Sequence, residues 1–341
     1  MLTKIHLEQF TAFKKLEVDL SSGLNVFIGA NGTGKTHIMK AAYAACDISV
    51  SGRNFADKLE KIFFPSNHQI GRLARRNKVS VSSKVAISRK IQEKTATLSL
   101  IFSNHTKTFE KASISGVETW GTEKIQSVFI PVKDMLANAP GFRSSYSRRE
   151  LHFEEIYDDI MERALLGTLK GPVDKERKKL LSILQKAISG KVLVKKEEFF
   201  LKNKQGELEF TLLAEGFRKL ALLYTLIQNG TLLNGSVLFW DEPEANLNPM
   251  LMDVVVDILL ALQRQGVQIF IATHDFVFLK WLSLKIDAKK DNIAYFSLYQ
   301  DDSGEIVLNS TRKYDEISPN AIDTGFERLA DEEIRQEMRR K

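Results

Sequence analysis

Eight consecutive residues near the start of the chain have the types and spacing of a phosphate-binding loop. The run Gly29-Ala-Asn-Gly-Thr-Gly-Lys-Thr36 fits the pattern G-x-x-x-x-G-K-[ST]. Its glycines let backbone N–H groups turn inward around phosphate oxygens, where a Cβ would obstruct them. Lys35 brings a positive charge to the β- and γ-phosphates, and Thr36 brings a hydroxyl to Mg²⁺. The loop is therefore predicted to bind nucleotide phosphates through Gly29, Asn31, Gly32, Thr33, Gly34, Lys35 and Thr36.

Two adjacent carboxylates end a hydrophobic run much later in the chain. Residues 237–240 are apolar, and Asp241 and Glu242 follow directly. At the carboxyl end of a parallel strand, Asp241 would face the phosphate-binding loop and hold Mg²⁺ through water. Glu242 would take a proton from the attacking water as a general base. Two solvated acids at a strand end are the alternative, but the presence of the loop favours the catalytic pair.

The apolar residues around these motifs alternate between strand and helix spacing. Runs at 24–28, 237–240 and 267–272 predict buried strands, and 35–48 and 217–229 have helical spacing. A further helix is expected from Asn248, as N-cap, and Pro249 to about Gly266. The pattern predicts an α/β fold with a mostly parallel central sheet covered on both faces.

Two other parts of the chain have a different character. Residues 79–115 are rich in Ser, Thr and Lys and predict a small antiparallel sheet with one wet face. Residues 150–189 are helical in pattern, and strand signals return at 191–213 with a turn at 203–206. The adjacent acids Asp158 and Asp159 have no partner pattern and are expected on a solvated surface.

Length and composition limit the class of protein. With 341 residues, the chain has room for two lobes or one large elaborated domain. Hydrophobic residues make up 43% and charged residues 27%, which excludes collagen-like and wholly disordered chains. The single cysteine, Cys46, excludes a disulfide scaffold and fits a reducing cytosol. Because no apolar run approaches the roughly 20 residues of a membrane span, we expect a cytoplasmic protein without membrane contact.

Positive charge is concentrated in one stretch. The net charge is only +6, but residues 71–94 contain eight basic residues against Glu93 alone. They are Arg72, Arg75, Arg76, Lys78, Lys84, Arg89, Lys90 and Lys94. Such a stretch attracts phosphate backbones, and a solvated basic face is an equally good explanation. Contact between 71–94 and DNA or RNA is therefore one of two open alternatives.

Three further segments complete a recognisable order of motifs. Residues 213–219, with Gly216 opening a helix, resemble the signature of ABC-type ATPases. Asp241-Glu-Pro-Glu-Ala-Asn-Leu-Asn-Pro249 resembles a Walker B segment with its D-loop, and Ile271-Ala-Thr-His274-Asp275 a switch histidine. This order resembles ABC, SMC and RecF-type ATPases over the chain up to about residue 310. The 241–249 run looks most like OLD-type AAA ATPases of prokaryotic antiviral defence, such as PtuA of Septu and AriA of PARIS.

The resemblance implies roles for particular residues. It implies an ABC-type P-loop NTPase head that binds ATP with Mg²⁺ and forms a homodimer around the nucleotide. Lys35, Glu242 and His274 would be catalytic, and the N–H of Gly216 would contact ATP held by a second subunit. Ala214 stands where the signature usually has Ser, so Arg218 would supply charge to the nucleotide instead. No Q-loop glutamine follows the strand at 127–130.

The motif order also predicts the domain organisation. We expect an ATPase core formed by 1–50 and 206–310, a basic β-rich insertion at 51–126, and a helical lobe at 127–205. Residues 311–341 are expected to form a C-terminal tail or helix.

Three functions fit these observations. The first is an ATPase that controls a separate nuclease or toxin in antiviral defence, since too few residues follow 310 for a TOPRIM nuclease domain. The resemblance implies that its ATP turnover is slow. The second is a RecF-like DNA-binding ATPase of recombination and repair. The third is a transporter subunit, which the missing Q-loop glutamine and the basic insertion disfavour.

Overall fold

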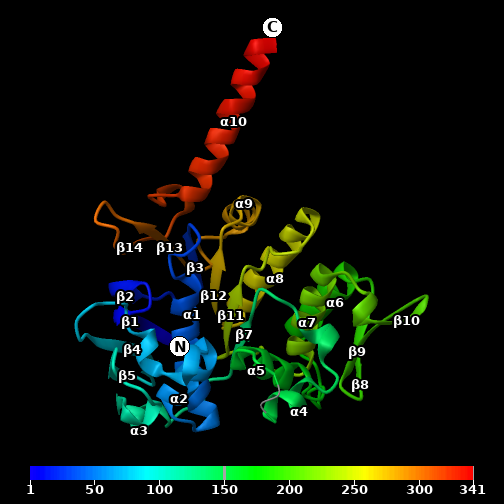
Figure 1. Ribbon diagram of the computed structural model, residues 1–341. Coiled ribbons are helices and arrows are strands. Elements are labelled where there is room, and N and C mark those ends of the chain that lie inside the picture. Colours follow the sequence, from blue (N-terminus) through cyan, green and yellow to red (C-terminus); the bar gives the residue numbers. More distant parts are fainter. Residues whose placement is uncertain (149–150, 341) are drawn as a thin grey trace.

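A six-stranded sheet runs through the middle of the protein (Figure 1). The computed structural model describes residues 1–148 and 151–340. The strand order is β14-β13-β3-β12-β11-β7, and every neighbouring pair is parallel except β13 with β14. The strands are β3 (Leu24–Gly29), β7 (Ser127–Ile130), β11 (Val237–Asp241), β12 (Gln268–Thr273), β13 (Ile293–Gln300) and β14 (Ile306–Thr311). The mostly parallel sheet predicted from the apolar runs is confirmed.

This sheet has a hydrophobic core on each face, because successive side chains of a strand point to opposite sides. On one face, Phe27, Phe239 and Phe270 pack in a stacked row with α1 (Lys35–Ser51). On the other face, residues such as Trp240 pack against helices. These helices are α7 (Glu215–Gln228), α8 (Met252–Arg264) and α9 (Phe276–Lys285). All residues of β3, β11 and β12 are buried, as expected for strands covered on both sides.

A second, antiparallel sheet covers the outer side of α1. Its order is β2-β1-β4-β5-β6. The strands are β1 (Leu2–Phe10), β2 (Phe13–Asp19), β4 (Ser82–Ile91), β5 (Lys94–Ser103) and β6 (Ser113–Ser115). The antiparallel strands expected at 79–115 are present, and β2 and β5 alternate between buried and exposed residues. They do not form a sheet of their own, however, because β4 pairs along β1. The apolar pattern shows which residues form strands but not which strands pair.

The remaining elements form a helical lobe and two flanking segments. The lobe contains α4 (Phe142–Ser147), α5 (Glu155–Ala164) and α6 (Lys175–Ala187), with a hairpin sheet of β8 (Lys191–Lys195), β9 (Glu198–Asn203) and β10 (Gly206–Glu209). Short α2 (Phe55–Phe63) and α3 (Val117–Trp120) lie on the side of the antiparallel sheet, and α10 (Ala321–Arg340) projects from the body (Figure 1). Among the described helices, none combines the length and apolar character that a membrane span requires.

Two helix starts differ slightly from their predicted positions. The helix expected at 217–229 begins two residues earlier, at Glu215. The helix expected from Asn248 opens with a 3-10 turn over Pro249–Leu251 before α8 begins at Met252. The Asn248 side chain accepts a hydrogen bond from the N–H of Met250, which confirms its role as a cap.

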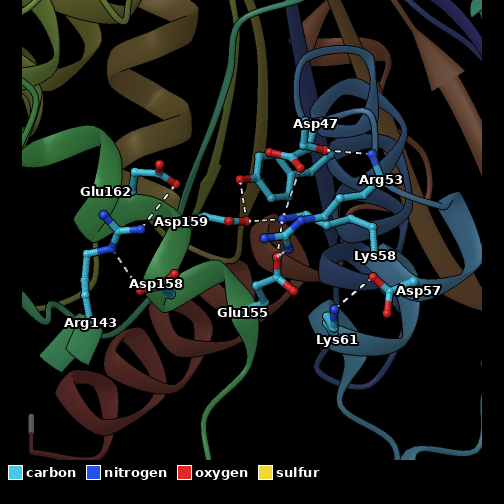
Figure 2. Close-up of polar contacts among 12 residues, drawn as sticks. Asp47, Arg53, Asp57, Lys58, Lys61, Arg143, Glu155, Asp158, Asp159 and Glu162 are labelled. Atoms are coloured by element: carbon cyan, nitrogen blue, oxygen red, sulfur yellow. Dashed lines mark hydrogen bonds and ion pairs between the residues drawn. The ribbon is translucent and has the colours of Figure 1, made fainter. Parts of the chain in front are cut away.

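A buried cluster of charges joins α1, α2 and the helical lobe (Figure 2). The Nζ of Lys58 in α2 lies 2.7 Å from Asp159 and 2.9 Å from Glu155, both in α5, and 3.1 Å from Asp47 in α1. Burial alone would lower the pKa of Lys58, but the three carboxylates raise it. The expectation that Asp159 is solvated is wrong, because three helices converge on it.

Lys58 is predicted to be a large contributor to stability. Lys58→Met leaves Asp47, Glu155 and Asp159 without their shared cation, so we expect a loss of about 3–5 kcal/mol in urea unfolding. Lys61→Met is the control, because Lys61 pairs with Asp57 in the same helix but is 42% exposed. It should cost less than about 1 kcal/mol. Equal losses in the two variants would contradict the role assigned to Lys58.

Candidate nucleotide-binding site

The predicted phosphate-binding loop connects the end of β3 to the start of α1. Gly29 leaves the strand with a φ of 148°, and a Cβ there would lie 2.2 Å from the carbonyl oxygen of Leu298. Gly34 precedes the helix with a φ of 90°, and a Cβ there would meet the ring of Phe13. The loop therefore needs glycine at both ends for conformation and for space. Between them, Asn31 and Gly32 are exposed, and Thr33 is buried with its hydroxyl donating to the carbonyl of Ala30.

Lys35 lies over this loop. Its Nζ donates hydrogen bonds to the carbonyls of Gly29, at 2.7 Å, and Ala30, at 3.0 Å. Burial lowers the pKa of Lys35, and the nearby carboxylates, with Asp241 the strongest, counter this effect. No acidic residue stands in the first turn of α1, so its positive dipole end is not offset by a side chain of that turn. The ammonium group and the helix end are the two features that the predicted binding of phosphate requires here.

Asp241 meets this loop from a distant part of the sequence. The hydroxyl of Thr36 donates to Oδ2 of Asp241 at 2.9 Å, across 205 positions of the chain. The two strands that bring them together, β3 and β11, are both paired with β12, and their carboxyl ends lie at the same edge. Burial raises the pKa of Asp241 to about 6, and the neighbouring charge of Glu242 adds to the shift.

These two oxygens suit a magnesium ion. Mg²⁺ prefers hard oxygen ligands and takes few from the protein when it also binds substrate phosphates. Thr36 and Asp241 offer a hydroxyl and a buried carboxylate at the end of the phosphate-binding loop. Within residues 1–148 and 151–340, no cluster of three or more His, Cys, Asp or Glu residues forms a separate metal site.

Glu242 and His274 lie together at the same sheet edge. Glu242 follows β11 with a φ of 48°, and its N–H donates to the carbonyl of Ala272 in β12. One carboxylate oxygen of Glu242 lies 3.3 Å from Nδ1 of His274, whose side chain is 47% exposed. The structure thus brings the two predicted residues into contact, with the imidazole reachable from outside.

The sequence interpretation missed the role of Glu244. This buried carboxylate accepts hydrogen bonds from the Thr273 hydroxyl, at 2.7 Å, and from the backbone N–H of His274, at 3.2 Å. Burial raises the pKa of Glu244, and these two donors work against that shift. Glu244 therefore fixes the backbone that carries His274. Its place in the Asp-Glu-Pro-Glu run was the available signal.

Helix α7 begins in the segment that resembles the ABC signature, is called the signature helix below, and packs closely on the loop after β11. Gly216 lies in the first turn of α7, and a Cβ there would come within 2.7 Å of the carbonyl oxygen of Asn246. Ala214, at the N-cap, makes no side-chain hydrogen bond to the helix end. The N-terminal turn of α7 is thus held against residues 245–248 without a capping side chain.

Lys219 is a second residue that the sequence interpretation missed. It is almost fully buried in α7, and its Nζ donates to the carbonyl of Ala245 at 2.7 Å and reaches that of Glu242 at 3.4 Å. Burial lowers the pKa of Lys219. Helix α7 is therefore hydrogen-bonded to the segment that carries Glu242, the predicted general base. No local spacing rule connects Lys219 with a segment more than twenty residues away.

Arg218 is engaged within its own chain. Its Nε lies 2.8 Å from Oδ2 of Asp134, and its guanidinium donates to the carbonyl of Phe210 at 3.0 Å. Asp134 belongs to the segment after β7 where the Q-loop glutamine is missing. A contact between Arg218 and a nucleotide stays a prediction, and it would require release of Asp134.

The basic stretch at 71–94 divides into structural and exposed residues. Arg89 is buried, stacks on Trp120 at 4.5 Å and donates to backbone carbonyls, so it belongs to the core. Arg75 pairs with Glu305 at 2.8 Å, and Lys90 pairs with Glu93. The exposed residues for which the described part of the chain shows no ion pair are Arg72, Arg76, Lys78 and Lys94. Contact with nucleic acid stays a prediction for this smaller set.

Comparisons with known proteins match most of the chain to one family. Residues 24–280 match the family described as "AAA domain, putative AbiEii toxin, Type IV TA system". A segment of 67 residues is 33% identical to the DNA replication and repair protein RecF of Vibrio campbellii, and 45 residues are 40% identical to RecF of Cytophaga hutchinsonii. These segments cover 18% and 13% of this chain and 19% and 12% of the relatives, so the chain matches less than a fifth of each relative's length.

Solved structures show the same fold at low sequence identity. An SMC head bound to the C-winged helix domain of ScpA aligns with a TM-score of 0.57 and 15% identity, covering 92% of this chain and 98% of that one. An SMC head with an extended coiled coil, bound to the C-terminal domain of ScpA derived from Pyrococcus furiosus, aligns at 0.53 and 12%, covering 98% and 99%. The fold is that of an SMC or ABC ATPase head.

The raised pKa of Asp241 predicts a cost to stability. Its folded pKa of about 6 exceeds the ordinary 3.8, so the folded chain binds the extra proton between these values and loses stability as pH rises through them. Asp241→Asn should therefore be more stable than the parent above about pH 6, on the order of 2–3 kcal/mol, with little gain near pH 4. Thermal unfolding in the presence of a chelator measures this difference. Asp302→Asn, at an exposed position, is the control; a pH-independent difference for Asp241→Asn would contradict the burial argument.

Proposed function

The chain belongs to the AAA-domain family, and from that premise we propose that it binds ATP with Mg²⁺ and hydrolyses it as an ABC-like ATPase. The observation that carries the proposal is the hydrogen bond between Thr36 and Asp241 beside Lys35. A phosphate-binding loop and a buried carboxylate are the two parts that phosphoryl transfer needs in one place. The fold of an SMC head supports the same reading.

The loop would position the phosphates. Lys35 would exchange its bonds to the carbonyls of Gly29 and Ala30 for the β- and γ-phosphate oxygens, and the N-terminus of α1 would add its dipole. Thr36 and Asp241 are the residues that would hold Mg²⁺, which when bound neutralises charge that develops on the phosphates. The remaining chemistry belongs to the side chains around Glu242.

Glu242 would act as the general base. Its carboxylate is 28% exposed, so water can reach it, and it lies beside His274. The carboxylate would accept a proton from water as the water oxygen attacks the γ-phosphorus and the bond to the leaving diphosphate breaks. His274 would contact the γ-phosphate, held in place through Glu244. This assigns the proton transfer to one residue and the sensing of the γ-phosphate to another.

A second subunit would complete the site. The N-terminal turn of α7 has no side-chain cap, so its N–H groups at Gly216 suit a γ-phosphate held by a partner copy. Lys219 bonds this helix to the backbone of Glu242, which would link dimerisation to catalysis. Such a composite site would hydrolyse ATP only in the dimer. Because two subunits must first come together, ATP hydrolysis would be slow.

The biological role we propose is control of a separate effector, a nuclease or toxin, in antiviral defence. The description of the matching family, "AAA domain, putative AbiEii toxin, Type IV TA system", supports a link to toxin–antitoxin systems. The resemblance of residues 241–249 to OLD-type ATPases supports the same role. The ATPase would change state on nucleotide binding and pass that change to the effector.

Glu242→Gln is predicted to bind ATP without hydrolysing it. The amide cannot accept a proton from water, while Thr36, Asp241 and Lys35 remain for binding. We expect turnover to fall at least about a hundredfold, as removal of a general base usually does. Light scattering should show an ATP-dependent dimer that persists. Glu93→Gln, at an exposed site, is the control; undiminished hydrolysis by Glu242→Gln would show that another residue is the base.

A RecF-like DNA-binding ATPase is the second candidate, favoured by the local RecF matches and the exposed basic residues. It predicts DNA binding whose affinity falls steeply with salt concentration, because the protein releases salt cations from the DNA phosphates when it binds. Arg72→Glu with Arg76→Glu should flatten that slope by about one to two units. Arg89 is avoided because it is part of the core. If the salt dependence of DNA binding is unchanged in this variant, Arg72 and Arg76 do not contact DNA and this basic surface is simply solvated.

A further inference from the structure

The C-terminal helix stands away from the body but starts beside the nucleotide site. Helix α10 spans 20 residues, of which only Ile322 is buried. The helix projects from the body of the protein (Figure 1). A hollow of about 360 Å³ lies between residues 29–31 of the phosphate-binding loop, His274 and the first turns of α10. The ring of Phe326 stacks on that of Phe276, two residues after His274, at 4.1 Å. A molecule bound along α10 would therefore lie next to the predicted γ-phosphate sensor.

An apolar row follows α10 from this base to its end. The row has one member every four residues, and such residues are neighbours on a helix surface. Its members are Ile322, Phe326, Ala330, Ile334 and Met338. The side chains of Phe326, Ile334 and Met338 are 44%, 51% and 73% exposed. Most helices in proteins owe their stability to packing of an apolar face, which this helix lacks beyond its first turns. The row is a surface that a partner would cover.

The charges around the row are divided by sign. The two neighbouring rows of the helix carry five carboxylates against two arginines, Arg335 and Arg339, and both arginines lie near the C-terminal end. The carboxylates are Asp323, Glu327, Asp331, Glu333 and Glu337. Over the first three turns the flanking charges are all negative, and Arg328 lies on the opposite side of the helix, because each residue turns the helix by about 100°. The apolar row thus has negative charge along one edge over its first three turns, and near its C-terminal end two carboxylates lie on one edge and two arginines on the other.

We propose that this face of α10 docks a cationic amphipathic helix of a partner protein, with its apolar side on the row and its lysines or arginines beside the carboxylates. A second α10 running in the same direction would place carboxylates against carboxylates, whereas an antiparallel copy would set Asp323 and Glu327 near Arg339 and Arg335, so self-association is an outcome that the test must separate. An anionic membrane surface is disfavoured because interfacial helices flank their apolar face with basic residues. This partner would be the effector of the proposed function, so the inference rests on the proposal that the chain controls a separate effector.

The test uses two synthetic helical peptides of about 18 residues, one with leucine and lysine faces and one with glutamate in place of lysine. Binding to the full chain is measured by fluorescence anisotropy without nucleotide. We expect the lysine peptide to bind at least about tenfold more tightly. Ile334→Ser with Met338→Ser should remove most of that binding, and Glu327→Lys with Glu333→Lys should reverse the preference. Arg328→Glu, on the opposite side of α10, is the matched control and should not weaken binding.

Several results would overturn the proposal. The first is equal binding of the two peptides. The second is unchanged peptide binding by the serine variant, with its helix content retained in circular dichroism. The third is self-association of the chain without peptide that the serine variant abolishes. ATP hydrolysis is measured in parallel, and the serine variant should keep the parent rate because Ile334 and Met338 lie beyond the hollow. If the parent protein hydrolyses no ATP, the proposed ATPase activity is wrong. If the parent hydrolyses ATP but does not prefer the lysine peptide, only the docking surface is wrong.

Discussion

The hydrogen bond between Thr36 and Asp241 is the contact on which the candidate site depends. It joins residues 205 positions apart, and neither β3 nor β11 pairs with the other. Only their common neighbour β12 holds them in register, with Ile28 opposite Thr273 and Asp241 opposite Ala272. The strands must be parallel for their carboxyl ends to meet at one edge, and such strands are covered on both faces, in keeping with the complete burial of β3, β11 and β12.

Buried charges extend this site to the rest of the molecule. Lys219 bonds the signature helix to the backbone of Glu242, and Glu244 holds the backbone of His274. On the other side of the sheet, Lys58 joins α1, which begins at the phosphate-binding loop, to α5 of the helical lobe. Each cation or carboxylate is costly to leave unpaired in the interior. A shift of the loop or of Glu242 would therefore be felt in the helices bonded to them.

Much of the fold, and the motifs of the site, could be predicted because their signals are local. Residue type and spacing are enough to identify the loop at 29–36, the carboxylates at 241–242 and the apolar strands that position them. Asp159, Arg89 and Lys219 could not be placed, because their partners come from distant helices or carbonyls. The pairing of β4 with β1 was hidden for the same reason. Arg218 is a further example, since its ion pair with Asp134 depends on how the lobe packs.

The most direct test of the central claim is a double-mutant cycle on Mg²⁺-dependent ATP affinity, with Thr36→Val, Asp241→Asn and the double variant. If both oxygens serve one ion, each single change should remove most of the Mg²⁺ effect, and the double variant should be little worse than either. A coupling of at least about 1 kcal/mol is expected for groups that act as a unit. Additive losses, or ATP binding in which Mg²⁺ makes no difference to the parent chain, would contradict the account.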